Sequence, residues 1–197
     1  MDGLNFIDEY LADSIVVKQK LAGSAELKMK IMQLAEQIEK VFLCGNKVLI
    51  AGNGGSAGDS QHIAAEFVSR FMYDRPGLPA IALTTDTSML TAIGNDYGFE
   101  KLFSRQVQAQ GVKGDIFIGI STSGNSKNVM SAVEEASKKG LFTVALCGSG
   151  GKLRTMVDLA ICAPSESTPF IQECHIVIGH VVCAIVEEKM FPRDQYS

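Results

Sequence analysis

The chain contains 197 residues, of which 46% are hydrophobic and 20% are charged, and its formal net charge is −4. This length favours one domain with a full hydrophobic core, and the composition excludes disordered and fibrous proteins. Nucleic-acid binding is disfavoured as the main activity, because it normally needs a concentrated positive surface and no basic run here exceeds two residues.

Three features bear on the compartment of the protein. The longest apolar run, 176–186, is interrupted by His180 and is shorter than the roughly 20 residues that span a bilayer. The N-terminus lacks the basic flank and cleavage site of a signal peptide. The five cysteines show no CxxC spacing and lie in apolar surroundings, which is typical of buried reduced thiols. We therefore expect a cytoplasmic protein that does not associate with a membrane.

Residues 1–45 are expected to form a helical segment. Apolar side chains recur with a period of about 3.6 from residue 5 to residue 44, and Gly23-Ser24 interrupts the pattern, which predicts two helices. Gly45 is typical of a helix C-terminus. We expect this amphipathic hairpin to cover the core or to pack against a partner subunit.

Residues 46–192 alternate short β-rich runs with longer helical runs. The β-rich runs predict strands at 48–51, 80–83, 115–120, 143–146 and 159–162. Apolar strands separated by helices predict an α/β domain, with a parallel sheet covered on both faces. Ligand sites in such domains lie at the carboxyl ends of the strands.

The segment from 170 to 190 is ambiguous from its composition. Its β-branched residues favour a strand, but the segment is too long for an ordinary strand. Thr168-Pro169 makes a good N-cap and first helical residue. We interpret the segment as a buried helix.

Two glycine- and serine-rich loops each follow an expected strand and precede an expected helix. They are Gly52-Asn53-Gly54-Gly55-Ser56 and Ser121-Thr122-Ser123-Gly124-Asn125-Ser126. Hydroxyl groups and the free N–H groups of a helix N-terminus favour an anion, so the two loops together indicate a phosphate-bearing ligand. The alternative is a pair of tight turns without a ligand. The P-loop ending Gly-Lys-Ser/Thr is absent from the sequence, which disfavours nucleotide hydrolysis.

Titratable side chains follow the first loop and recur near the C-terminus. His62 and Glu66 are four residues apart and share one helix face, where they favour proton transfer or metal binding, although a surface ion pair is the alternative. On the C-terminal helix, Gln172 lies about 60° from His175 and about 80° from His180, on opposite sides. This spacing does not choose between the two histidines, and a hydrogen-bonded core histidine remains an alternative for His180.

The motifs together resemble those of one known family. They are Asn53-Gly54-Gly55-Ser56, Gln61-His62, Glu66, Thr84-Thr85-Asp86-Thr87-Ser88, Gly94-Asn95-Asp96, Phe103-Ser104-Arg105-Gln106-Val107, Ser121-Thr122-Ser123-Gly124-Asn125-Ser126 and Ile171-Gln172-Glu173 with His180. This set is similar to that of the phosphoheptose isomerases, bacterial members of the sugar-isomerase (SIS) domain superfamily. The similarity covers residues 10–190.

The resemblance implies a fold, an assembly and an activity. The fold is a three-layer αβα SIS fold, with a central five-stranded parallel sheet and an N-terminal helical extension. The assembly is a homotetramer with active sites at subunit interfaces. The activity is ketose–aldose isomerisation of D-sedoheptulose 7-phosphate to D-glycero-D-manno-heptose 7-phosphate through an enediol. In the family this reaction begins the synthesis of nucleotide-activated heptose for lipopolysaccharide or surface glycans.

The resemblance also implies roles for individual residues. It assigns the sugar phosphate to Ser121, Thr122, Ser123 and Ser126. It assigns the other substrate contacts to Asn53, Gly54, Gly55, Ser56, Glu66, Arg70, Asn95, Asp96 and Gln172. It implies one zinc ion per subunit, held by His62, Glu66, Gln172 and His180. Glu66 and His180 match the acid/base pair of the family, which selects His180 over His175.

Two alternatives to this activity stay open on the sequence. A relative of the family is a non-enzymatic tetramer that binds the bacterial replication initiator protein, but it lacks the glutamate and histidine that correspond to Glu66 and His180. The other alternative is a different phosphosugar isomerase on the same scaffold. The helix with His62 and Glu66 and the pairing of Gln172 with His180 argue against it.

Overall fold

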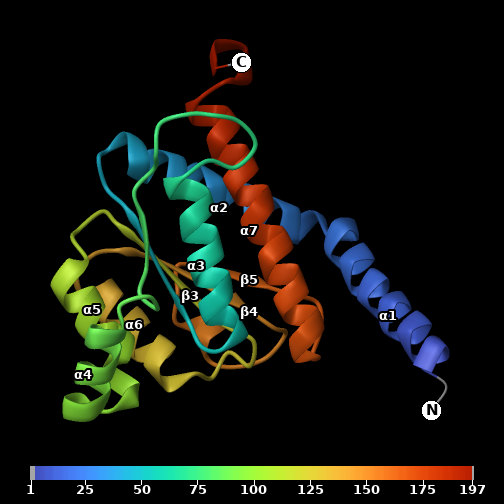
Figure 1. The fold of residues 1–197 in the computed structure, drawn as a ribbon, viewed down its shortest axis with the longest axis horizontal. Coiled ribbons are helices and arrows are strands. Elements are labelled where there is room, and N and C mark those ends of the chain that lie inside the picture. Colours follow the sequence, from blue (N-terminus) through green and yellow to red (C-terminus); the bar gives the residue numbers. More distant parts are fainter. Residues whose placement is uncertain (1–2, 197) are drawn as a thin grey trace.

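The computed structural model describes residues 3–196 and is built around one parallel sheet (Figure 1). Its five strands lie in the order β2-β1-β3-β4-β5. They are β1 (Val48–Gly52), β2 (Ala80–Ala82), β3 (Ile116–Ser121), β4 (Phe142–Cys147) and β5 (Leu159–Cys162). The five predicted strands and their parallel arrangement are thereby confirmed. Strands β1 and β3 are completely buried, as expected of a sheet covered on both faces.

The helices form a layer on each face of this sheet (Figure 1). One layer contains α1 (Gly3–Gly23), α2 (Ala25–Leu43), α3 (Gly55–Val68) and α7 (Thr168–Met190). The other contains α4 (Thr87–Tyr97), α5 (Leu102–Gln110), α6 (Lys127–Lys138) and the short 3-10 turns Phe99–Lys101 and Leu153–Thr155. A last short helix, α8, spans Arg193–Tyr196. The predicted three-layer αβα architecture is therefore confirmed.

The N-terminal segment is the expected pair of helices, apart from residues 1 and 2, which lie outside the described residues. The Ser24 hydroxyl caps α2 by accepting a hydrogen bond from the Leu27 amide at 3.2 Å. Helix α2 packs against α7 and β5, whereas α1 buries only Ser14, Val17 and Leu21 and projects away from the body of the molecule (Figure 1). A domain boundary after residue 45 stays a prediction.

The ambiguous C-terminal segment is the helix α7, as we interpreted it. It begins at Thr168 with Pro169 in its first turn. By length and composition alone α7 would be long enough to cross a membrane, but 44% of its most apolar window is buried inside the protein, where it packs on α2, α3 and the sheet. It is the core helix of this fold.

Helices α3 and α7 run side by side in the same direction and position the candidate site. Gly55 lies against Gln172 at one end, and Ile63 lies against Gly179 about two turns further along. A Cβ on Gly179 would lie 2.7 Å from Ile63 Cδ1, so glycine is required for the two helices to approach this closely. The two helices are therefore parallel and packed in register, so that residues about 117 positions apart in sequence are neighbours in space.

Candidate functional site

The two glycine- and serine-rich loops meet at one edge of the sheet. Strands β1 and β3 are neighbours, and Gly52 pairs with Ile120 at their carboxyl ends. The strand order places the reversal of the sheet between these two strands, which is where α/β folds of this order bind ligands. The structure therefore brings both predicted anion loops to the expected ligand position.

The first loop makes a tight turn into α3. Gly54 has a φ of +56°, and a Cβ on Gly52 would lie 2.6 Å from the carbonyl oxygen of Ser56, so both positions require glycine. Asn53 is held by a reciprocal amide pair with Asn128 at the start of α6, with two hydrogen bonds of 2.8 and 2.9 Å. Asn128 thus links the two loops, and the sequence did not single it out.

The second loop presents hydroxyl groups at the N-terminus of α6. Ser126 precedes this helix, and its hydroxyl makes no cap bond but lies 2.8 Å from the Ser121 hydroxyl. Thr122, Ser123 and the loop 149–151 line a depression of 290 Å³. A neighbouring depression of 440 Å³ is lined by Asn53, Phe99, Glu100, Ser126, Lys127 and Asn128. Hydroxyl groups, an ammonium and a helix N-terminus form an environment that stabilises a phosphate.

The acid/base candidates lie together two turns along α3 from the first loop. His62 Nε2 is 2.8 Å from His180 Nε2 and 3.3 Å from Glu66 Oε1. A contact of 2.8 Å between two imidazole nitrogens requires that one carries a proton and the other accepts it. The His180 ring also packs against Phe71, with the ring centroids 5.4 Å apart. Glu66 and His180 therefore both contact the same atom, His62 Nε2, and the three side chains form one polar cluster.

His175 is separate from this cluster. Its side chain is fully buried, and neither ring nitrogen has a hydrogen-bond partner of good geometry among the described residues, although the main chain of Cys147 lies near. Burial lowers the pKa of His175 to about 4, so the imidazole is neutral at pH 7. The tertiary structure places His180, and not His175, beside His62.

Asp59 is a titratable neighbour of the cluster that the sequence reasoning missed. It lies one turn before His62 on the same face of α3, and its Oδ2 atom is buried without a hydrogen-bond partner. Burial raises the pKa of Asp59, while the nearby His62 opposes this shift. Asp59 precedes His62 by three residues, and this spacing could have placed it on the same helix face from the sequence.

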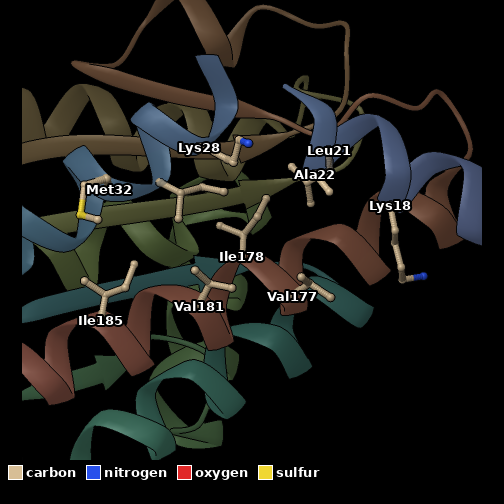
Figure 2. Close-up of a pocket in the computed structure, with 10 residues that line it drawn as sticks. Lys18, Leu21, Ala22, Lys28, Met32, Val177, Ile178, Val181 and Ile185 are labelled. Carbon is tan, nitrogen blue, oxygen red and sulfur yellow. The ribbon is translucent and has the colours of Figure 1, made fainter. Parts of the chain in front are cut away.

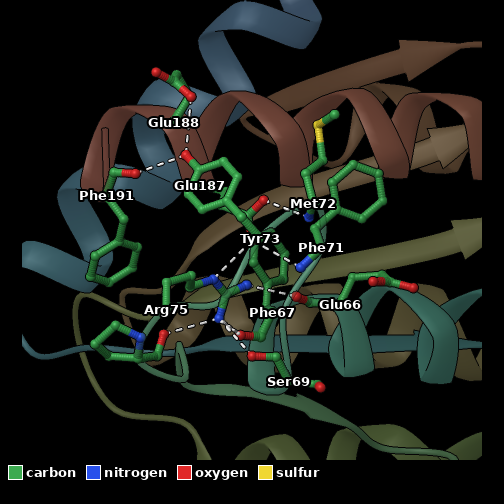
Figure 3. Close-up of polar contacts among 11 residues, drawn as sticks. Glu66, Phe67, Ser69, Phe71, Met72, Tyr73, Arg75, Glu187, Glu188 and Phe191 are labelled. Atoms are coloured by element: carbon green, nitrogen blue, oxygen red, sulfur yellow. Dashed lines mark hydrogen bonds and ion pairs between the residues drawn. The ribbon is translucent and has the colours of Figure 1, made fainter. Parts of the chain in front are cut away.

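A buried ion pair fixes α7 against the end of α3 (Figure 3). Arg75 Nε lies 3.1 Å from Glu187 Oε1, and both side chains are 1% exposed. The Arg75 guanidinium also donates to the main-chain oxygen atoms of Glu66, Phe67, Ser69 and Pro76. Glu187 in turn accepts hydrogen bonds from the Phe71 and Met72 amides, at 2.8 and 2.7 Å. No local pattern indicates this pair, which holds the helix of Glu66 against the helix of His180.

Four other predicted site residues lie apart from the acid/base cluster. The Gln172 amide passes over Gly55, where a Cβ would be 2.4 Å from its nitrogen, and Gln172 is eight residues or about 12 Å along α7 from His180. Asn95 and Asp96 bond to each other on the exposed side of α4. Arg70 is exposed just beyond α3. One chain alone does not bring these residues to His62.

The donor atoms of the cluster suit a divalent metal in their chemistry. Two imidazoles and one carboxylate are typical zinc ligands. Their contacts are pairwise, however, and within residues 3–196 no three His, Cys, Asp or Glu side chains meet in metal-binding geometry. His62, Glu66 and His180 thus fit the chemistry of a zinc site, whereas Gln172 lies against Gly55.

Comparison with known proteins adds independent information. The SIS domain family model matches residues 9–148. "Phosphoheptose isomerase 2" of Campylobacter jejuni is 58% identical over 195 residues, covering 98% of this chain and 97% of the relative. This chain belongs to the phosphoheptose isomerase family of SIS-domain proteins. The resemblance drawn from the motifs is thereby confirmed.

Further members support the same family and fold. The phosphoheptose isomerase of Aneurinibacillus thermoaerophilus is 57% identical over 188 residues, covering 95% of each chain. The solved structure of a phosphoheptose isomerase from Francisella tularensis superimposes with a TM-score of 0.92 at 41% identity, covering 95% of this chain and all of the other. Family members therefore match this chain almost from end to end, helical N-terminal segment included.

Proposed function

We propose that this chain is a ketose–aldose isomerase that converts D-sedoheptulose 7-phosphate to D-glycero-D-manno-heptose 7-phosphate. The observation that carries the proposal is the cluster of Glu66, His62 and His180, in a protein more than half identical to phosphoheptose isomerases. The hydroxyl-rich loop at the N-terminus of α6 supports a phosphorylated substrate. We further propose that the reaction takes place in the cytoplasm and supplies heptose for nucleotide activation.

The reaction moves a carbonyl group from C2 to C1 of the sugar. Glu66, as a carboxylate, removes the carbon-bound proton from C1 and returns a proton to C2, with an enediol between the two steps. His180 moves the proton between the two oxygens, and its contact with His62 orients its imidazole beside Glu66. The serine hydroxyls hold the phosphate at the far end of the substrate and so fix the reacting carbons relative to Glu66.

We propose zinc as the cofactor of this site, bound by His62, Glu66, His180 and Gln172. Zinc would polarise the carbonyl oxygen and stabilise negative charge on the enediol oxygens. Two imidazoles, a carboxylate and a neutral amide, with no thiolate, form a weaker set than structural zinc sites use. We therefore expect a metal that chelators remove without unfolding the protein.

We also propose a homotetramer with active sites at subunit interfaces. Three observations support this assembly. An apolar groove of 510 Å³ lies between α1, α2 and α7, and Leu21, Met32, Ile178 and Val181 point into it (Figure 2). Helix α1 exposes a set of large apolar side chains, namely Leu4, Phe6, Ile7, Leu11, Ile15 and Val16. Asn95, Asp96 and Arg70 are exposed and apart from His62, which suits residues that complete a neighbouring subunit's site.

The proposed activity is tested by following sedoheptulose 7-phosphate by NMR. Wild type is expected to form an aldoheptose 7-phosphate, and Glu66→Gln and His180→Gln are each expected to lose about 10²–10⁴-fold in kcat. Glu134→Gln, an exposed change on α6, is the matched control and should retain full turnover. A well-folded wild type without turnover at any zinc concentration would contradict the proposal and favour the partner-binding alternative.

A further inference from the structure

Two cysteines lie side by side at the ends of neighbouring strands, away from the acid/base cluster. Cys147 ends β4 and Cys162 ends β5, and the two residues are direct partners in the parallel register. Their sulfur atoms are 3.5 Å apart. Neighbouring strands are about 4.8 Å apart, which falls within the Cα separation that a disulfide accepts. These two thiols can therefore be joined with little movement of the backbone.

The surroundings of Cys162 favour its thiolate. The contact with the Cys147 sulfur is the main cause, and the cations of Lys30 and Arg154 add to it, against the opposing effects of burial and of Glu26. Together they lower the pKa of Cys162 below its usual value, and the same contact together with burial raises the pKa of Cys147. The pair thus consists of one nucleophilic sulfur and one protonated neighbour.

The thiolate is also within reach of a small molecule. Cys162 is half-buried and lines a surface depression of 450 Å³, together with Ser24, Glu26, Leu27, Lys30, Arg154, Thr155 and Ala160. Lys30 and Arg154 line the same depression, and their positive charges favour an anion there. Cys147, in contrast, is fully buried behind it.

The pair is directly connected to the candidate phosphate loop. Cys147 is the register partner of Ser121, and the next residue, Gly148, donates its amide to the Thr122 oxygen at 3.1 Å. The Ala163 amide, which follows Cys162, donates to the Cys147 oxygen at 2.8 Å. The segments after both cysteines contribute Ser149 and Ser165 to the depression beside Thr122. A bond between the two sulfurs would therefore constrain the loops around the phosphate position.

We propose that Cys147 and Cys162 form a redox site that reacts with peroxides and closes to a disulfide between β4 and β5. The Cys162 thiolate attacks one peroxide oxygen and breaks the O–O bond, giving a sulfenic acid and a hydroxide, which takes up the proton released by Cys162. The Cys147 sulfur then attacks the sulfenyl sulfur, and its proton leaves with the departing hydroxyl as a second water. Two thiols and one hydrogen peroxide thus give one disulfide and two waters. The closed form binds the phosphosugar less well.

The test treats the fully reduced protein with hydrogen peroxide and measures the intact mass, followed by peptide mapping without reductant. The expected result is a loss of two hydrogens, about 2 Da, with Cys147 and Cys162 in one cross-linked peptide, and full reversal by a thiol reductant. Cys162→Ser and, as a second variant, Cys147→Ser should each abolish the cross-link. Cys44→Ser, which removes an exposed lone thiol, should leave it unchanged.

The functional arm measures isomerisation before and after peroxide, with circular dichroism to establish that each variant is folded. The KM for the phosphosugar should rise in the oxidised wild type and in Cys44→Ser, return with reductant, and stay constant in Cys162→Ser. Oxygen addition at Cys162 without a cross-link, or a cross-link that forms only through Cys44, would overturn the proposal. The mass measurement does not depend on the proposed isomerase activity. A failure of the redox proposal is therefore distinguishable from a failure of the proposed activity.

Discussion

Arg75 and Glu187 form a fully buried ion pair that joins α3 to α7. Arg75 Nε lies 3.1 Å from Glu187 Oε1, and Arg75 Nη2 donates to the Glu66 main-chain oxygen at 2.7 Å (Figure 3). The same guanidinium therefore contacts the backbone of the proposed base and the helix of His180. Because α3 and α7 are parallel neighbours, anchoring them to each other at one end also keeps His62 aligned with His180.

We predict that Glu187→Gln lowers the free energy of unfolding by about 3–5 kcal/mol, because it leaves the buried Arg75 charge without a counterion. Urea denaturation measures the change, and the midpoint of thermal unfolding should fall by about 2–4 °C per kcal/mol. Glu188→Gln, the exposed neighbour on the same helix, should stay within about 0.5 kcal/mol of wild type. A loss below about 1 kcal/mol in Glu187→Gln would show that the pair does not clamp the helices.

His175 is predicted to make stability depend on pH between about 4 and 6.5. Burial holds its folded pKa at about 4, below the unfolded value near 6.5, so the unfolded state binds more protons in this window. Stability contributed by the neutral imidazole is therefore complete above pH 6.5 and is lost as the pH falls, by up to about 3 kcal/mol. Urea titrations from pH 7 to pH 4.5 should show this slope in wild type and a smaller slope in His175→Leu. Equal slopes would contradict the assignment.

Ser126 is predicted to contribute to substrate affinity and little to the chemical step. Its hydroxyl is 2.8 Å from Ser121 and faces the phosphate position, which is remote from C1 and C2. Ser126→Ala should raise KM about tenfold, as expected for one lost hydrogen bond to a charged group, with kcat nearly unchanged. Ser137→Ala at the exposed end of the same helix is the matched control. A drop in kcat with constant KM would place Ser126 in the chemistry instead.

Zinc binding is predicted to depend on His62, Glu66 and His180 more than on Gln172. Metal content after dialysis against zinc should be about one per chain in wild type and in His175→Leu, and should fall strongly in His62→Ala and His180→Ala, which remove an imidazole ligand. Gln172→Ala should lose less, because an amide is a weak ligand and this side chain lies against Gly55. The circular dichroism of the chelated protein should match that of the zinc-loaded protein. Full zinc content in His180→Ala would exclude this site.

The exposed apolar face of α1 is predicted to lie in a subunit contact. Ile15 is 54% exposed on this helix, and Ile15→Glu would place a charge in the apolar contact and raise the subunit dissociation constant tenfold or more, about 1.4 kcal/mol. Val112→Glu, at 52% exposure on a loop after α5, is the control of matched exposure. Size exclusion with light scattering gives the masses. An unchanged mass for Ile15→Glu at nanomolar protein would remove α1 from the contact.

The periodicity of apolar residues was sufficient to predict the main helices and strands of the fold. Each strand is a continuous apolar run because it is buried on both faces, and such runs separated by amphipathic helices specify a parallel sheet. The tight turn into α3 could also be predicted from Gly52 and Gly54. A Cβ at Gly52 would clash with Ser56, and Gly54 has a positive φ. The spacing of His62 and Glu66 was sufficient to place both side chains on one face of α3, because this inference depends only on helix geometry.

The choice between histidines, in contrast, depended on contacts between distant segments. Spacing along α7 left His175 and His180 equivalent, and only the packing of α7 in the fold buries the first near Cys147 and brings the second to His62. The Arg75–Glu187 pair and the Cys147–Cys162 pair join residues 112 and 15 positions apart, with no local pattern to mark them. Local sequence determined the elements, because hydrogen bonding and periodicity are local. The tertiary structure alone decided which side chains share a site, because that depends on how helices and strands pack.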